Sequence, residues 1–298
     1  MDDSELELFR RVGKIASRIR EDSKRLIMIG ESLLDIAETV EQMIGEEGCK
    51  PAFPVNISIN DIAAHYTPEF EAEASLSETD LVKIDIGVEL KGALADTAYT
   101  VDLGGENAKL VKASEDALEN AVKAIRPGTS VGEVGGVVED TIKGYGFNPI
   151  ANLSGHMIKS NELHAGVEIP NIRSNDPYRF VAGDIFAVEP FATTGRGYVE
   201  DLEQVEIFSL YSMANVRMRQ SRKIAEHVIN NYGMLPFAER WVRKSFQSKL
   251  LVSAALKEML QSHLIRGYPI LREVSRGLVS QTEHTILVTE DGCEVMTR

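Results

Sequence analysis

Two segments of the chain that lie 98 residues apart resemble each other, and this internal repeat restricts the possible folds more than any other feature. Residues 30–51 read GESLLDIAETVEQMIGEEGCKP, and residues 128–149 read GTSVGEVGGVVEDTIKGYGFNP, with seven of 22 positions identical. Each copy opens with a Gly and a Ser, continues with helical apolar spacing, and ends at a Gly before a Pro, which predicts a capped helix. Two copies are too few for a solenoid. We therefore expect a domain of two related halves, with chance similarity between two amphipathic helices as the alternative.

The composition allows a large core and argues against a secreted or membrane protein. Of the 298 residues, 43% are apolar, enough for one large domain or two smaller ones. The net charge of −14 argues against general nucleic-acid binding. Cys49 and Cys293 form no metal or redox spacing, which suits a reducing cytosol. The start of the chain, MDDSELELFRR, lacks a signal peptide's apolar core, and no apolar run has the length of a membrane span.

Residues 82–100, VKIDIGVELKGALADTAYT, predict a β-hairpin with one aspartate in each arm. Apolar residues alternate along the first arm, so Asp85 points to the other face. A turn centred between Leu90 and Lys91 would place Asp85 directly opposite Asp96, with Cβ atoms ~5 Å apart. The two charges then require a shared proton, a nearby basic residue or a metal ion. A hairpin whose acids face water is the alternative.

The remaining pattern predicts an α+β fold with a central antiparallel sheet and helices outside. In the second half, Glu189 lies in a strand-like run much as Asp85 does in the first. Between 210 and 270 strand signals nearly vanish, and segments 221–230, 237–246 and 253–265 are helix-like. Ten Lys or Arg and three acids give this stretch a charge of +7, and strand character returns at Glu283. We expect residues 210–270 to be a helical insertion.

Four acids, Asp85, Asp96, Glu189 and Glu283, are embedded in predicted strands. If they converge in one sheet, they cannot all stay ionised without cations. His227 and His263 lie in the helical stretch and are assigned to surface or packing roles, and His284 points away from the face of Glu283. Four carboxylates and one imidazole suit two divalent ions such as Co, Mn, Fe or Zn. Paired metals ~3.5–4 Å apart activate a bridging water for hydrolysis.

The candidate residues follow one another in a recognisable order. The set is Asp85, Asp96 eleven residues on, Gly155-His156, Glu189 before Pro190, and Glu283 in TEHTIL. This set, with the stretches 51–68 (PAFPVNISINDIAAHYTP), 154–171 (SGHMIKSNELHAGVEIPN) and 186–197 (FAVEPFATTGRG), resembles the type 2 methionine aminopeptidase family in an archaeal-like form. The resemblance implies a pita-bread fold, with pseudo-twofold halves around a curved antiparallel sheet. Residues 1–209 and 271–298 would form this catalytic domain, and residues 210–270 a winged-helix-like insertion.

The resemblance also implies roles for individual residues. Asp85, Asp96, His156, Glu189 and Glu283 would bind the two metal ions, with Asp96 and Glu283 bridging them and Glu189 also shuttling a proton. His65 and His164 would contact the substrate's scissile peptide. The methionine side chain would lie among Phe53, Leu163, Phe191 and Tyr268. Ile207 stands where the family often has a histidine, so the rim of this pocket is expected to differ.

The implied function is removal of the N-terminal methionine from nascent proteins in the cytoplasm, with a preference for small second residues. We expect a monomer by default, no membrane partner, and the ribosome surface as a candidate partner of the basic insertion. An Xaa-Pro peptidase is one alternative, but such enzymes usually carry a sizeable N-terminal domain, and only about 50 residues precede PAFP here. A non-catalytic relative that binds RNA or the ribosome is another, although all five ligand positions are intact.

Overall fold

The structure is a computed structural model that describes residues 3–246 and 248–298. The helices are α1 (Asp3–Ser23), the 3₁₀ helix η1 (Lys24–Leu26), α2 (Leu33–Glu46), α3 (Ala108–Ala124), α4 (Val131–Gly144), α5 (Arg219–Asn231), α6 (Glu239–Ser245) and α7 (Lys249–Gln261). The strands of the first half are β1 (Lys50–Pro51), β2 (Asn56–Ile59), β3 (Ile62–Ala64), β4 (Leu81–Leu90) and β5 (Ala93–Asp102). Those that follow are β6 (Asn148–Pro149), β7 (Ser154–Ile158), β8 (Glu168–Pro170), β9 (Ile185–Val188), β10 (Phe191–Thr193), β11 (Val199–Leu210), β12 (Phe237–Ala238), β13 (Ile265–Glu273), β14 (Val279–Gln281), β15 (His284–Val288) and β16 (Cys293–Val295).

The internal repeat is confirmed in the structure. Helices α2 and α4 begin and end at positions that differ by 98 in number, and β1 and β6 follow them at the same offset. Ser32 caps α2 by accepting a hydrogen bond from the amide of Asp35, and Ser130 caps α4 in the same way. Gly48 and Gly146, with φ of 71° and 84°, provide the left-handed turn after each helix. Both copies therefore fold as a capped helix followed by a short strand.

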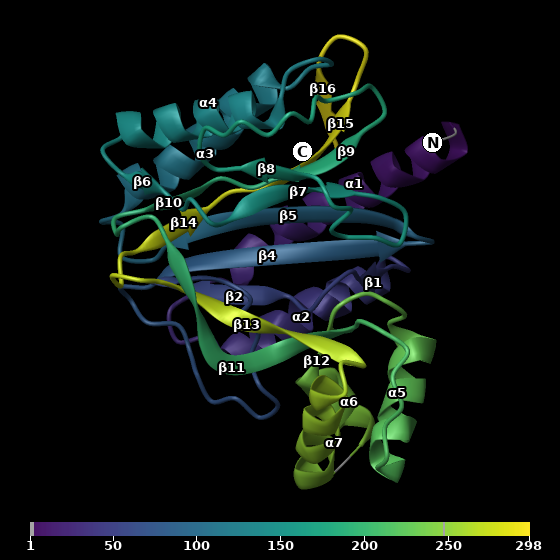
Figure 1. Cartoon of the computed structure of the whole chain (residues 1–298). Helices are drawn as coiled ribbons and strands as arrows, with labels where there is room; N and C mark the ends of the chain where they lie inside the picture. Colours follow the sequence, from purple (N-terminus) through teal and green to yellow (C-terminus); the bar gives the residue numbers. More distant parts are fainter. Residues whose placement is uncertain (1–2, 247) are drawn as a thin grey trace.

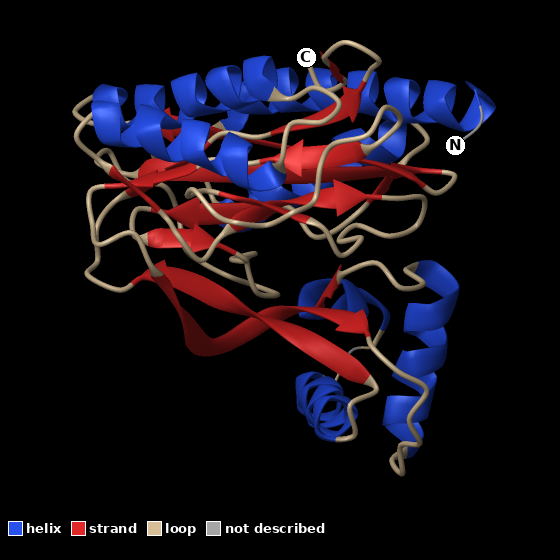
Figure 2. Ribbon diagram, turned by 45° about the horizontal axis from the view of Figure 1, so that its top comes forward, coloured by secondary structure: helices blue, strands red, loops and turns tan. Residues whose placement is uncertain are grey.

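The helices α1 to α4 cover one side of the sheets, and a long ribbon of β11 and β13 crosses the other side (Figures 1 and 2). One sheet contains β1, β4, β2 and β5, and another has the order β16-β15-β9-β7-β8. Smaller sheets have the orders β14-β10-β6 and β12-β11-β13-β3. The mixture of helices with antiparallel sheets agrees with the predicted α+β class.

The two halves meet along β5. The amide of Glu283 donates to the carbonyl of Ala98 (3.0 Å), and the Thr97 hydroxyl donates to the carbonyl of Glu283 (2.9 Å). The Thr285 hydroxyl accepts from the amide of Asp96 and donates to its carbonyl, both at 2.7 Å. These bonds fix Asp96 of the first half beside Glu283 of the second.

The hairpin forms as predicted, but its predicted register is wrong. Leu90 pairs with Ala93, so Lys91 and Gly92 alone form the loop, with φ of 50° and 92°. A two-residue loop with positive φ at both positions matches the twist of a hairpin, and glycine adopts that conformation readily. Asp96 therefore pairs with Gly87, and Asp85 with Ala98. The two aspartates are diagonal neighbours on the same face rather than direct partners.

The stretch 210–270 contains the predicted helices, but the prediction that strands are nearly absent until residue 283 is wrong. Strand β13 begins at Ile265 and pairs with β11, β12 precedes α6, and β14 precedes Glu283. The sequence of β13, IRGYPILRE, contains Gly, Pro and charged residues that disfavour strands, so its pairing with β11 determines its conformation. Helices α5 and α7 pack over their own apolar cluster, beside the sheets in Figure 1.

Within residues 3–246 and 248–298, no helix has both the length and the apolar character that crossing a membrane requires.

Candidate metal centre and substrate cavity

A cavity of about 400 Å³ opens between the sheets and the β11–β13 ribbon. Its lining includes ten residues that the sequence singled out: Phe53, His65, Asp85, Asp96, His156, Leu163, His164, Glu189, Phe191 and Tyr268. Glu283 is buried beside this lining, because one of its oxygens lies within 4.8 Å of ligand atoms of Asp96 and His156. The structure therefore brings all eleven predicted site residues to one place.

The acids reach the cavity from strands of both halves. Asp85 and Asp96 come from β4 and β5, and His156 comes from β7. Glu189 and Glu283 were predicted inside strands, but each lies in a break, directly after β9 and directly before β15. Pro190, which has no amide hydrogen to donate, follows Glu189 and is itself outside the strands. The breaks lie next to each other, since Val188 pairs with His284.

The ionisable atoms of the cluster lie close together. The Nε2 atom of His156 lies 3.5 Å from Oδ2 of Asp96 and 3.7 Å from Oε1 of Glu189. Gln281 is a site residue that the sequence analysis missed. Its amide nitrogen lies 3.4 Å from Glu189 and 3.3 Å from Glu283. The signal was its position two residues before Glu283, which places both on one face of an extended segment.

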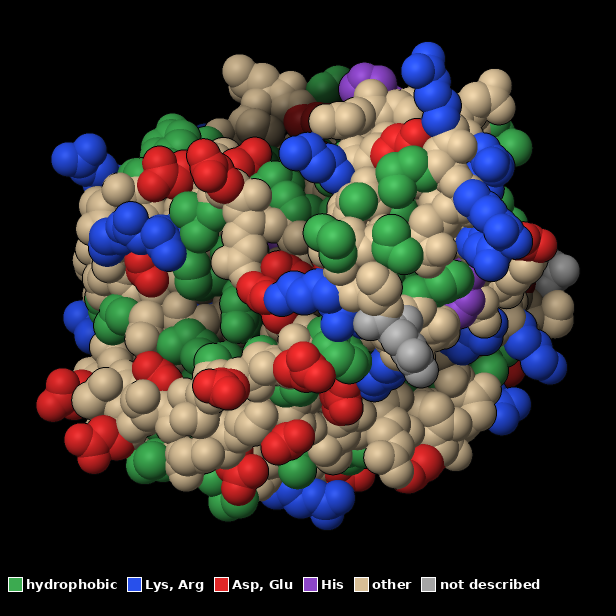
Figure 3. Space-filling view, turned by 90° about the horizontal axis from the view of Figure 1, so that it is seen from below, with side chains coloured by type: hydrophobic (Ala, Val, Ile, Leu, Met, Phe, Trp, Pro, Cys, Tyr) green, Lys and Arg blue, Asp and Glu red, His purple; other side chains and the backbone are tan. Residues whose placement is uncertain are grey.

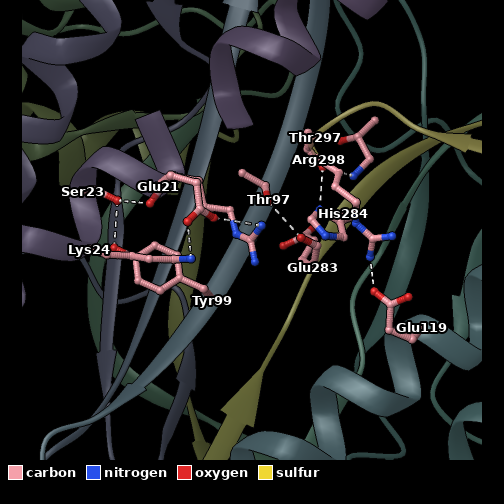
Figure 4. A network of polar contacts seen from close by, with 12 residues as sticks. Glu21, Ser23, Lys24, Thr97, Tyr99, Glu119, Glu283, His284, Thr297 and Arg298 are labelled. Carbon is pink, nitrogen blue, oxygen red and sulfur yellow. Dashed lines mark hydrogen bonds and ion pairs between the residues drawn. The ribbon is translucent and has the colours of Figure 1, made fainter. Parts of the chain in front are cut away.

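His284 lies on the other side of this segment, as predicted. Its Nδ1 atom forms a 2.8 Å hydrogen bond with the Thr297 hydroxyl, which also accepts from the amide of Thr285 at 3.1 Å. Figure 4 shows the contact between His284 and Thr297, together with the bond from Thr97 to Glu283. The last residues of the chain thus hold the backbone of the Glu283 segment from behind.

Burial and mutual repulsion disfavour ionisation of all four acids. Burial raises the pKa of Asp96 to about 7. Burial, followed by the charge of Asp96, raises the pKa of Asp85 and of Glu283 well above the ordinary range. Burial also raises the pKa of Glu189, and the neighbouring His156 opposes this. Without cations, this cluster must therefore hold protons at neutral pH.

The unsatisfied atoms of the cluster match a cation site. Asp85 Oδ1, Asp96 Oδ1 and Glu283 Oε1 are buried and accept no hydrogen bond within the part of the chain that the structure describes. Buried polar atoms without partners are costly and rare in native proteins. Carboxylate oxygens with one imidazole form a donor set that suits Mn, Fe, Co or Zn. Asp96, His156 and Glu283 are close enough to share one ion.

Two more histidines face the same cavity. Burial lowers the pKa of His65, and burial followed by the nearby His156 lowers the pKa of His164 to about 3, so both rings are neutral at pH 7. The Nδ1 atom of His65 lies 3.1 Å from the carbonyl of Pro269, which can only accept, so this nitrogen donates. The Nε2 atom of a neutral His65 is therefore an acceptor. His65 also has a φ of 65°, a conformation that is uncommon for residues other than glycine.

The remainder of the cavity is largely apolar. Phe53, Leu163 and Phe191 are buried, and Tyr268 packs edge-on against His65 at 5.7 Å between ring centroids. Ile207 lines the cavity and pairs with Tyr268 across β11 and β13. Pro236, which the sequence analysis missed, adds a wall from the segment between α5 and β12. Its place could not be found from spacing, because it lies 47 positions after Glu189.

Comparison with known proteins identifies the family of the chain. The pattern that defines metallopeptidase family M24 matches residues 7–290. A methionine aminopeptidase of Methanocaldococcus jannaschii is 46% identical over 286 residues, which cover 96% of each chain. One from Thermococcus onnurineus is 48% identical over 294 residues, which cover 98% of this chain and 99% of the other.

Solved structures agree on the fold. A thermophilic Arx1 superposes with a TM-score of 0.87 at 18% identity, covering 99% of this chain and 91% of that one. The methionine aminopeptidase of Thermotoga maritima gives a TM-score of 0.74 at 22% identity, covering 100% and 98%. The predicted pita-bread fold is confirmed. The chain belongs to metallopeptidase family M24, among its methionine aminopeptidases.

Proposed function

We propose that this chain removes the N-terminal methionine of newly made proteins in the cytosol by hydrolysis assisted by two divalent ions. The observation that carries the proposal is a buried cluster of four carboxylates and one imidazole beside an apolar cavity of about 400 Å³. An apolar, partly aromatic cavity suits the flexible thioether side chain of methionine. The relatives, at up to 48% identity, carry the name of this activity.

Five residues would hold the ions, which we propose to be two of Co, Mn, Fe or Zn. Asp96 and Glu283 would bridge them, Asp85 would bind one, and His156 and Glu189 would bind the other. Asp96 interacts with Asp85 and also lies within 4.8 Å of ligand atoms of His156 and Glu283, which supports this division. When bound, such a pair of ions supplies Lewis-acid activation of water and of a peptide carbonyl.

The chain's own residues would move the proton and orient the peptide. Glu189 lies beside His156 and has a raised pKa, so its carboxylate suits a group that takes up a proton and returns it to the leaving amine. A neutral His164 can donate a hydrogen bond to the carbonyl oxygen as charge develops there. A neutral His65 that donates through Nδ1 to Pro269 would accept a substrate N–H at Nε2. This assigns the two histidines opposite hydrogen-bonding roles.

A metal-dependence experiment with matched peptides tests the proposal. Protein stripped of metal should release no methionine from Met-Ala-Ser, and activity should return on adding back Co, Mn, Fe or Zn singly. Met-Lys-Ser should be cleaved far more slowly, because we expect the second side chain to meet a crowded wall of the site. Preferential cleavage of Xaa-Pro peptides that lack methionine, or activity that survives metal removal, would contradict the proposal.

We further propose that the ribosome surface contacts the basic side of segment 210–270, which appears on the right of Figure 3. Part of the charge is not available to a partner, because Arg240 and Arg243 are buried and the exposed Lys244 already binds Glu38 at 2.9 Å. Besides Lys244, the exposed basic residues are Arg217, Arg219, Arg222, Lys223, Lys249, Lys257 and Arg266. Binding to phosphates should weaken steeply as salt rises, because counterions are released.

The test variant has four exposed basic residues changed to Gln: Arg217, Arg219, Arg222 and Lys223. It should co-sediment less with ribosomes at low salt and still cleave a free tripeptide. The matched control changes four exposed lysines of α3 and α4 to Gln: Lys109, Lys112, Lys123 and Lys143. Equal co-sedimentation of both variants would show that the basic face is not the contact.

A further inference from the structure

Two apolar walls of the cavity come from segments that are far apart in the sequence. Phe53 lies between β1 and β2, and Pro236 lies directly before β12, in the stretch between the long strands β11 and β13. Both are buried. The positions of the walls of an apolar pocket determine which side chain fits it, so a contact that fixes both segments would affect selectivity.

One buried carboxylate contacts both segments. Glu41 of α2 accepts hydrogen bonds from the amide of Val55 (3.3 Å) and from the indole nitrogen of Trp241 (2.8 Å), and it forms an ion pair with Arg240. Val55 is two residues from Phe53, and Arg240 is four residues from Pro236. Glu41 thus connects the backbone beside one wall to the helix that follows the other.

Thr67 completes this connection. Its hydroxyl accepts from Arg240 at 3.0 Å and donates to the carbonyl of Val55 at 2.8 Å. The two backbone groups of Val55 are therefore bound by Glu41 and Thr67, which both bind Arg240. We call Glu41, Thr67, Arg240 and Trp241 the Glu41 cluster.

The cluster has the burial expected of a rigid connection. The Arg240 side chain is 0% exposed and that of Glu41 10% exposed. A buried ion pair contributes little net stability when whole, but removing one partner leaves an uncompensated charge that the surrounding segments must move to solvate. No residue of the cluster lines the cavity. Its effect on substrate must therefore pass through the two walls.

We infer that Glu41 is a positioning residue that holds Phe53 and Pro236 at the spacing that selects methionine as the first residue of the substrate. This inference rests on the proposed function and adds a determinant of selectivity outside the cavity. A small change of shape in an apolar pocket alters discrimination by about 10–200-fold. Loosening the cluster should therefore affect substrate binding and selectivity more than the chemical step.

The test compares Glu41→Gln with Glu38→Gln as the matched control. Glu38 lies one turn earlier on α2 and pairs with Lys244 of the same helix α6, but its side chain is 37% exposed. For Met-Ala-Ser, Glu41→Gln should raise KM about tenfold and change kcat by less than about twofold. The preference for Met-Ala-Ser over Leu-Ala-Ser should fall by about tenfold, with bound metal unchanged. Glu38→Gln should behave like the parent protein.

A second variant keeps the inference testable if Glu41→Gln does not fold. Trp241→Phe removes one hydrogen bond to Glu41 and keeps an aromatic side chain, and it should shift KM and selectivity in the same direction by about threefold. The inference is overturned if the folded variants match Glu38→Gln, or if they lose kcat and metal together while the Met-over-Leu preference stays constant. A parent protein that releases no methionine would instead refute the proposed function itself.

Discussion

At the scale of single residues, the surroundings of Asp96 lead to a specific prediction. Asp96 is buried, it interacts with Asp85, and it lies within 4.8 Å of ligand atoms of His156 and Glu283; burial raises its pKa to about 7. Asp96→Asn should abolish or nearly abolish turnover, because an amide cannot supply charge to two ions. Stability of the metal-free protein should hold or rise, since one source of repulsion is removed. Kinetics, metal content and urea unfolding of the metal-free variant check this, and near-normal activity with two bound ions would contradict it.

His65 and His164 should act on substrate, whereas His156 should act on metal. Replacing either of the first two by Ala should lower kcat/KM by ~10²–10⁴, the usual effect of losing a positioned polar group. Metal affinity should barely change in these variants. His156→Ala should lose metal directly. Titration of the metal-free variants with one ion separates the cases, and equal loss of affinity in all three would show that the division of roles is wrong.

The sequence singled out residues that the structure brings together at one cavity. The acids stood out because aspartate and glutamate in apolar runs require a partner. Gln281 and Pro236 did not stand out in the same way, because a glutamine or a proline near a strand has many ordinary explanations. For Gln281 the one local signal was its position two residues before Glu283. The position of Pro236 depends on contacts with a segment 47 positions from Glu189, which spacing along the chain does not encode.

At the scale of elements, helices α2 and α4 were predictable because their caps, apolar spacing and stop signals are local. The register of the β4–β5 hairpin was not, since it depends on whether Lys91 adopts positive φ beside Gly92. When a neighbouring pair of residues forms the hairpin loop, each cross-strand pairing moves by two positions, and every side chain stays on the same face of the sheet. The conclusion that Asp85 and Asp96 share a face therefore held, although they are not directly opposite.

The true register gives Gly87 a function that the predicted one did not. Gly87 is opposite Asp96, and a Cβ atom there would lie 2.3 Å from the Phe53 ring. Gly87→Ala should force that ring toward the cavity, raise KM for methionine peptides and destabilise the fold by about 1–3 kcal/mol, as overpacking does. Steady-state kinetics and urea unfolding measure both effects.

The control is Gly45→Ala, in α2, where a Cβ atom would meet nothing within 4 Å. It should stabilise the protein by about 0.5–1 kcal/mol, because alanine favours a helix over glycine, and leave KM unchanged. If Gly87→Ala matched this control, the ring would be free to move away from β4, and the proposed packing would be wrong.

At the scale of the whole molecule, the repeat predicted two halves but not how they join. The seam between β5 and the Glu283 segment depends on threonines such as Thr97 and Thr285, whose hydroxyls bond to backbone groups nearly 190 positions away. Threonine is common in strands for other reasons. The strands β12 and β13 were missed for a related cause, because pairing with β11 outweighs their weak local preference.

The change of folding stability with pH should include a contribution from Glu206, an acid outside the site. Glu206 of β11 is 9% exposed, and burial raises its pKa to about 7. In the unfolded chain its pKa returns to the ordinary range near 4.3. Between these values the folded state holds a proton that the unfolded state has released, so Glu206 lowers stability as pH rises from about 4.3 to 7.

Glu206→Gln removes this titration, because glutamine is neutral at every pH. At pH 4 the free energy of unfolding of the variant should equal that of the parent. At pH 8 it should be higher than that of the parent by on the order of 1–3 kcal/mol. Urea unfolding of both metal-free proteins across this range measures the difference, in which the titrations of the other acids cancel. Glu200→Gln, at an exposed position of the same strand, serves as the control and should follow the parent. Parallel curves for Glu206→Gln and the parent would mean that Glu206 is already ionised in the folded protein, and that burial on β11 does not hold its proton.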